Sequence, residues 1–140
     1  SALPSRCIEG KMMKPHKTSI LVIDDESDIR NSLKEFLEDF GYEVTEAGHA
    51  EEALELLESR DFDLAIVDLR LPGMSGDVFI LEAAKRTLKM KYLIHTGSVG
   101  YRLSIELLEL GLTNDDVFHK PIEDLMTLID KIGVLLKNDE

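Results

Sequence analysis

The sequence predicts an α/β fold, a three-layer α/β/α sandwich built on a doubly wound, five-stranded parallel sheet. From Thr18 onward, short apolar runs alternate with segments whose apolar residues recur every three or four positions. This alternation is typical of parallel strands joined by crossover helices. The chain has 140 residues, of which 44% are hydrophobic, and this suffices for one domain with a single core.

The five predicted strands are short runs rich in β-branched and apolar residues. The first and third are almost wholly apolar, as expected of central strands that helices cover on both faces. The strands are predicted at residues 20–24, 43–47, 64–68, 92–96 and 117–119.

The five predicted helices show apolar residues at helical spacing. Gly41 and Gly111 follow two of these segments directly and supply C-terminal stops. The helices are predicted at residues 29–40, 50–57, 78–84, 103–110 and 125–136.

Composition excludes several classes of function. The formal charge of -12 disfavours direct binding to nucleic acid, which needs clustered basic residues. No apolar run approaches the roughly 20 residues needed to span a membrane. The single cysteine, Cys7, excludes an internal disulfide and fits a reducing compartment, so a cytoplasmic location is expected.

Residues 1–17 differ from the rest of the chain. They contain two prolines, show no structural period and carry four basic residues against one acidic residue. We interpret residues 1–17 as a flexible arm, linker or expression remnant, with a basic docking arm as the alternative. Residues 18–140 form the predicted domain, which is either a stand-alone unit or a piece of a longer protein.

Charged residues end three of the predicted strands. Asp24 ends the first strand and Asp25 follows it, Asp68 ends the third, and Lys120 follows the fifth. Carboxyl ends of parallel strands meet at one edge of the sheet, where three carboxylates would repel each other unless a cation lay between them. Oxygen ligands without a cysteine or histidine cluster favour Mg²⁺. For Asp24 and Asp25 taken alone, capping of the following helix is the structural alternative.

The same edge has the groups that a phosphoryl group requires. Thr96 ends the fourth strand and precedes the small residues Gly97 and Ser98. A metal ion, an ammonium group and a hydroxyl can together stabilise the charge of a phosphoryl group in transfer. A carboxylate can act as the nucleophile and form an acyl phosphate.

Taken together, these motifs resemble one known family. The chain is similar to the receiver domain of two-component response regulators over about residues 18–136. The motifs that carry the resemblance are Asp24-Asp25-Glu26 after an apolar strand, the segment 68–76 with sequence DLRLPGMSG, Thr96-Gly97-Ser98, and Lys120-Pro121.

The resemblance implies a role for each site residue. Asp68 would accept a phosphoryl group, and Asp24, Asp25 and Asp68 would hold Mg²⁺ together with the backbone carbonyl of Arg70. The five strands would have the flavodoxin-like order 2-1-3-4-5.

Further implications concern the phosphoryl group and the partners. Thr96 and Lys120 would bind the phosphoryl oxygens, and the Lys120–Pro121 peptide would be cis. The phosphoryl donor would be a sensor histidine kinase or phosphotransfer protein, and the output would be a protein target or an output domain outside this chain. The domain would not be a turnover enzyme, since it would only accept and slowly lose one phosphoryl group. The resemblance leaves a homodimer open.

Two departures from the family pattern fall on the predicted fourth helix, fifth strand and fifth helix, the surface that the family usually uses for output. Val117 stands where the family usually has a tyrosine or phenylalanine, and its short side chain has one stiff torsion. Phe118 is adjacent, but strand alternation predicts that it faces the opposite side of the sheet. The connection 111–116 is also slightly longer than usual.

Three alternative functions use the same architecture. A phosphatase of the haloacid-dehalogenase type would need a second acid two residues after Asp68, where this chain has Arg70. A flavin binder would need a glycine- and serine-rich phosphate loop after the first strand, where this chain has an acidic motif. An adaptor receiver that is not phosphorylated would not need the acids or Lys120.

Overall fold

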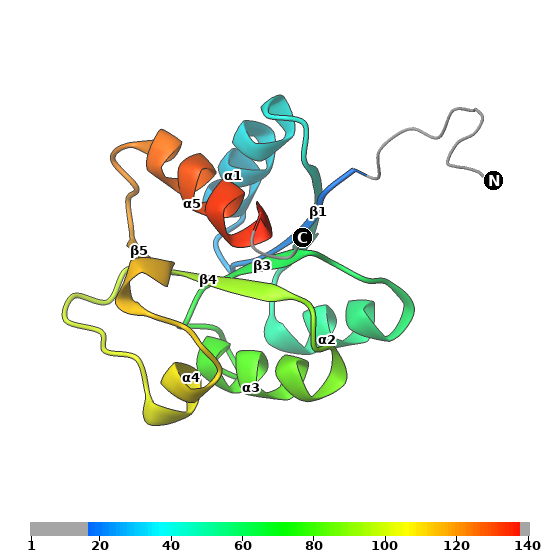
Figure 1. Cartoon of the computed structure of the whole chain (residues 1–140), viewed down its shortest axis with the longest axis vertical. Helices are drawn as coiled ribbons and strands as arrows, with labels where there is room; N and C mark the ends of the chain where they lie inside the picture. The colour runs from blue at the N-terminus through cyan, green and yellow to red at the C-terminus, as the bar shows by residue number, and fades with distance from the viewer. Residues whose placement is uncertain (1–16, 138–140) are drawn as a thin grey trace.

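The computed structural model describes residues 17–137, so the predicted arm falls outside the described residues except for Lys17. Strands and helices alternate along this part of the chain, as predicted (Figure 1). The elements are β1 (Ser19–Ile23), α1 (Ser27–Asp39), β2 (Glu43–Ala47), α2 (Ala50–Ser59), β3 (Leu64–Val67), α3 (Gly76–Arg86), β4 (Lys91–Thr96), α4 (Ile105–Glu109), the 3-10 turn η1 (Asn114–Asp116), β5 (Val117–His119) and α5 (Leu125–Lys137).

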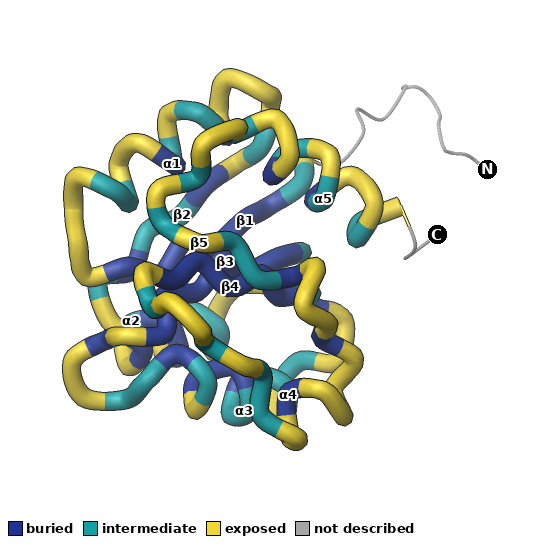
Figure 2. The backbone as a smooth tube through the Cα atoms, turned by 90° about the vertical axis from the view of Figure 1, so that its left-hand side faces the viewer, coloured by how far each residue is buried: buried dark blue, intermediate teal, exposed yellow. Residues whose placement is uncertain are grey.

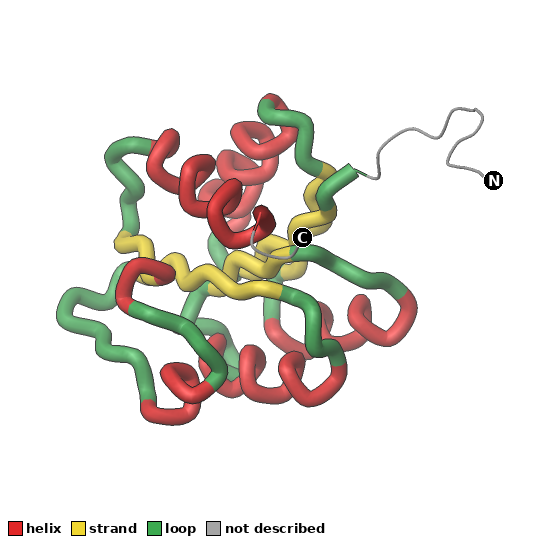
Figure 3. The backbone as a smooth tube through the Cα atoms, viewed as in Figure 1, coloured by secondary structure: helices red, strands yellow, loops and turns green. Residues whose placement is uncertain are grey.

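The five strands form one parallel sheet with the order β2-β1-β3-β4-β5. This is the order that the resemblance implied. Helices α1 and α5 cover one face, while α2, α3 and α4 cover the other (Figures 1 and 3). The fold is therefore the predicted three-layer doubly wound sandwich, in which ligand chemistry is found at the carboxyl ends of the strands.

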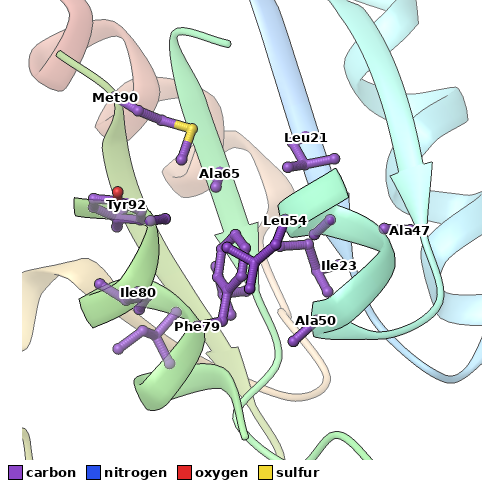
Figure 4. Close-up of a cluster of buried hydrophobic side chains, with 14 of the residues drawn as sticks. Leu21, Ile23, Ala47, Ala50, Leu54, Ala65, Phe79, Ile80, Met90 and Tyr92 are labelled. Atoms are coloured by element: carbon purple, nitrogen blue, oxygen red, sulfur yellow. The ribbon is translucent and has the colours of Figure 1, made fainter. Parts of the chain in front are cut away.

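The central strands are buried on both faces, and the helices are exposed on their outer sides (Figure 2). Alternate residues of β1 face opposite layers: Leu21 and Ile23 pack with α2 and α3, while Ile20 and Val22 pack with α1 and α5. Phe79 of α3 is fully buried in the first of these layers (Figure 4). Burial from both sides makes the sheet a rigid support for the loops at its edge.

Two strand ends differ from the prediction by one residue. β1 ends at Ile23 and β3 ends at Val67, so Asp24 and Asp68 are the first residues after their strands. The backbone N–H groups of both aspartates still donate to the neighbouring strand, that of Asp24 to Ala47 and that of Asp68 to Ile23. The aspartates thus keep the strand direction while their side chains enter the loop region.

The fourth helix is shorter than predicted, because it begins at Ile105 and ends at Glu109. The Ser104 hydroxyl accepts a hydrogen bond from the N–H of Leu107 at 3.2 Å and caps the helix there. Leu103 therefore lies outside the helix, although it still packs against the core from the loop. Apolar spacing alone did not distinguish the loop contact from a helical turn.

The prediction for Val117 and Phe118 is confirmed. Val117 packs against the layer that contains α2, α3 and α4, whereas Phe118 packs against the layer that contains α1 and α5. Phe118 therefore cannot take the place of an aromatic residue at position 117 without a change of strand register.

Candidate functional site

The charged strand ends meet at one edge of the sheet, as the sequence predicted. The ammonium group of Lys120, which follows β5, lies 2.9 Å from Asp24 Oδ2 and 3.2 Å from Asp68 Oδ2. It also lies 3.2 Å from Glu26 Oε2. The side chains of Lys120, Asp24 and Asp68 are 12%, 2% and 4% exposed, so water screens this charge cluster only weakly.

Four carboxylates gather at this edge, and three of them, Asp24, Glu26 and Asp68, contact the Lys120 ammonium. One oxygen from each of Asp24, Asp25, Glu26 and Asp68 lies within 4.8 Å of the others. Glu26 was not predicted as a ligand, although its position directly after Asp25 in the sequence was the available signal. It precedes the first residue of α1 and is exposed.

The residues present fit a small divalent cation. Asp24 Oδ2 is buried and accepts no hydrogen bond within residues 17–137. Its partner among these residues is the ammonium of Lys120, with which it forms an ion pair. A buried carboxylate oxygen with remaining lone pairs, next to three further carboxylates, is a suitable ligand set for Mg²⁺.

The backbone of Arg70 lies against Asp68, because its N–H donates to Asp68 Oδ1 at 3.2 Å. The Arg70 side chain is exposed. The second oxygen of Asp68 faces Lys120, so the two oxygens of this carboxylate have different environments. Asp68 is thereby held in a defined orientation at the end of β3.

Charge and burial shift the pKa values of Asp68 and Lys120. Burial raises the pKa of Asp68 to about 6, and the nearby Asp24 carboxylate adds to the rise, although Lys120 opposes it. Burial alone would lower the pKa of Lys120, but the carboxylates of Asp24 and Asp68 outweigh it and raise that pKa to about 12. Lys120 therefore stays charged at neutral pH, while Asp68 is a carboxylate whose negative charge is energetically unfavourable without a further cation.

Thr96 lies on the neighbouring strand, fully buried at the end of β4. Its hydroxyl accepts a hydrogen bond from the N–H of Ser98 at 3.0 Å, and its carbonyl accepts one from the N–H of Lys120 at 2.8 Å. The structure thus places Thr96 beside Lys120 in the sheet, with its hydroxyl bound to the following loop. The Lys120–Pro121 peptide is cis, as the resemblance implied.

His95 of β4 is buried. Burial lowers its pKa to about 4, and the charge of Lys120 acts in the same direction. His95 and Lys120 line a cleft of about 570 Å³ between the start of α1 and the start of α5, whose other walls include Ile29, Leu33 and Leu125. His119, in contrast, is exposed.

Gly76 is a structural requirement of the site that residue chemistry alone did not reveal. It opens α3, and its N–H donates to the carbonyl of Leu69 at 3.0 Å. A Cβ atom on Gly76 would overlap the backbone carbonyl of Asp68. The glycine that ends the segment 68–76 is therefore needed for the close approach of α3 to the backbone of Asp68 and Leu69.

Comparison with known proteins assigns the family. The family model described as the response regulator receiver domain matches residues 20–132. The chain belongs to this family. This assignment to the receiver family supports neither the phosphatase alternative nor the flavin-binding alternative.

Relatives of this receiver domain include a transcription regulator and receivers of known structure. The chain is 32% identical over 108 residues to the transcriptional regulatory protein FixJ of Bradyrhizobium diazoefficiens, covering 77% of this chain and 52% of FixJ. It is 34% identical, with a TM-score of 0.74, to response regulator TrrA of Thermotoga maritima in complex with Mg²⁺ and BeF, covering 85% of this chain and 99% of TrrA. It is 32% identical, with a TM-score of 0.74, to a receiver domain protein of Methanospirillum hungatei, covering 88% of this chain and 96% of that one.

The receiver spans about half the length of the curated relatives that it matches, at 52% of FixJ and 43% of response regulator GtcR of Aneurinibacillus migulanus. Across residues 17–137, no helix has the length and apolar character that crossing a membrane requires.

Proposed function

We propose that this receiver accepts a phosphoryl group on Asp68 from the phosphohistidine of a sensor histidine kinase or phosphotransfer protein. The observation that carries the proposal is the convergence of Asp24, Asp68 and Lys120 within 3.2 Å contacts at one edge of the sheet. In the transfer, a carboxylate oxygen of Asp68 forms the new P–O bond while the P–N bond to the donor histidine breaks. The product is an acyl phosphate on Asp68.

Each neighbouring group has a distinct part in this proposal. Asp24, Asp25, Asp68 and the carbonyl of Arg70 would hold Mg²⁺, which would supply positive charge to the phosphoryl oxygens. Lys120 neutralises a further part of that charge, because its raised pKa keeps it protonated throughout the neutral range.

Thr96 is proposed to report the modification. Its hydroxyl would leave Ser98 and bind a phosphoryl oxygen, so the loop after β4 would move. The acyl phosphate carries up to two negative charges where the carboxylate carried one, and a local change of this kind can bias such a loop between two arrangements. The output would be altered binding of a protein target, or of an output domain, at the surface near α4 and β5. We propose no direct contact with nucleic acid.

The test uses Mg²⁺ with beryllium fluoride, and separately a small phosphodonor such as acetyl phosphate. Amide spectra are expected to change around Thr96 in the wild type. Asp68→Asn should abolish the response, whereas Asp61→Asn, which removes an exposed acid outside the site, should retain it. No response in the wild type, or an unchanged response in Asp68→Asn, would refute the proposal and favour an adaptor that is not phosphorylated.

A further inference from the structure

Arg30 of α1 contacts the backbone that carries the acidic pair. Its Nη1 donates to the carbonyl oxygen of Asp24, and its Nε donates to Glu46 Oε1 of β2 at 3.0 Å. The side chains of Arg30 and Glu46 are only 19% and 25% exposed. One guanidinium thus bridges the loop after β1 and the neighbouring strand from the side of α1.

The contact fixes a part of Asp24 that no other described contact holds. The N–H of Asp24 donates to Ala47, and its Oδ1 accepts from the N–H of Glu26 at 2.9 Å. The carbonyl is held by Arg30. Because the peptide group is planar, the direction of this carbonyl also sets the direction in which the chain enters Asp25.

Asp25 depends on this backbone restraint. Its side chain is exposed, and within residues 17–137 it makes no hydrogen bond or ion pair of its own. One of its oxygens nevertheless lies within 4.8 Å of the ligand atoms of Asp24 and Asp68. The position of Asp25 relative to the other carboxylates is therefore set mainly through the backbone of Asp24.

Glu46 controls where the guanidinium lies. Arginine forms strong paired hydrogen bonds with carboxylates. The carboxylates of the acidic cluster begin at Asp24, whose carbonyl Arg30 contacts, so they are competing acceptors for the guanidinium. Glu46 binds the Nε side of the guanidinium and directs it toward β2. Lys34 approaches the other oxygen of Glu46 at 3.8 Å, but no described contact joins Lys34 to Asp24.

We propose that Arg30 and Glu46 form a clamp that positions Asp24 and Asp25 for a divalent cation, so that Arg30 is a positioning residue for the site. The inference rests on the proposed function in naming Mg²⁺ as the cation. Arg30 does not touch the cation or the phosphoryl group. Residues that orient ligands from outside the coordination sphere typically change metal affinity by about 10-fold to 100-fold. We place Arg30 at the lower end of that range, because Asp24 keeps its other contacts.

The experiment measures the Mg²⁺ dissociation constant by amide chemical shifts, without any phosphodonor. Arg30→Ala is expected to raise the dissociation constant about tenfold. Arg30→Lys should recover part of the loss, because an ammonium can reach one acceptor but not both. Glu46→Gln should raise the constant about threefold in the wild type and cause no further rise in Arg30→Ala, since Glu46 acts through Arg30. Lys34→Ala is the matched control and should leave the constant unchanged.

A second measurement separates positioning from general stability. With a small phosphodonor, the Mg²⁺ concentration that gives half of the maximal phosphorylation rate should be about tenfold higher in Arg30→Ala than in the wild type. The maximal rate itself should stay within about twofold of the wild type. Urea unfolding in EDTA reports stability separately. If Arg30→Ala does not fold, Arg30→Lys and Glu46→Gln test the same coupling with smaller changes.

Different outcomes distinguish this inference from the proposed function. Wild-type Mg²⁺ affinity in Arg30→Ala, or in both conservative variants, overturns the clamp even if stability falls. A higher Mg²⁺ dissociation constant in Arg30→Ala, together with no phosphorylation of the wild type, supports the clamp and refutes the proposed function. Absence of Mg²⁺ binding by the wild type overturns both.

Discussion

The edge of the sheet at Asp68 and the region around α4 are built in different ways. At the first, Asp24 and Asp68 each contact the Lys120 ammonium within 3.2 Å, and all three side chains are largely buried. At the second, a helix of five residues lies between two connections, with Ile105 and Leu108 being 72% and 50% exposed. Only Leu107 of α4 is fully buried.

The difference shows which parts of this domain can change independently. A change at the charged edge leaves a buried charge without a partner, and this is costly. A change on the outer face of α4 removes few internal contacts, so its effect on stability is small. We therefore expect the proposed phosphoryl chemistry to limit which residues can stand at the sheet edge around Asp68. At α4, we expect the binding partner to set that limit.

The largest expected effect follows removal of the ammonium from the charged edge. Lys120→Met should lower the free energy of unfolding by about 3 kcal/mol at pH 7.5 in EDTA, because Asp24 and Asp68 lose their counter-charge. The loss should be smaller at pH 5, where Asp68 is protonated. Mg²⁺ should restore part of the stability by replacing the missing charge. Urea unfolding measures all three conditions, and an unchanged value at pH 7.5 would show that the carboxylates do not need Lys120.

Two residues of α4, one buried and one exposed, allow the same comparison within one short helix. Leu107→Ala should lower the free energy of unfolding by about 2 kcal/mol, because it removes buried apolar atoms from the core. Ile105→Ala should change it by less than about 0.5 kcal/mol, since this side chain is mostly exposed. Urea unfolding of both variants gives the measurement. Equal losses would contradict the exposure of the outer face.

The third prediction concerns the pH dependence of stability at the charged edge. The pKa of Asp68 rises from 3.8 to about 6 on folding, so the folded state binds a proton more tightly than the unfolded state. The free energy of unfolding should therefore fall as pH rises through this interval, and stay low above it. Asp68→Asn should match the wild type near pH 4 and exceed it by about 1–2 kcal/mol at pH 7.5 in EDTA.

Urea unfolding across pH 4–8 tests this last prediction. Mg²⁺ should close the gap between the wild type and Asp68→Asn at pH 7.5, because the cation stabilises the carboxylate of Asp68. A gap that is equally large at pH 4 and pH 7.5 would show that burial of Asp68, rather than its charge, causes the difference.

The layers of this protein, and the edge at which its charges meet, could be predicted from the order of its residues. Apolar alternation fixes strands and helices locally, and parallel strands place every carboxyl end on one side. Asp24, Asp68 and Lys120 could therefore be placed together although they are 44 and 52 positions apart along the chain. The residues that end β1 and β3 were predicted to within one position.

Tertiary structure decided what depends on contacts between elements. Glu26 joins the acidic cluster, and Arg30 binds Glu46 because α1 packs beside β2. The length of α4 was set by the cap at Ser104, which apolar spacing does not reveal. The raised pKa of Asp68 also required the structure, because burial and the distance between charges, rather than residue type, determine which protonation state is stable.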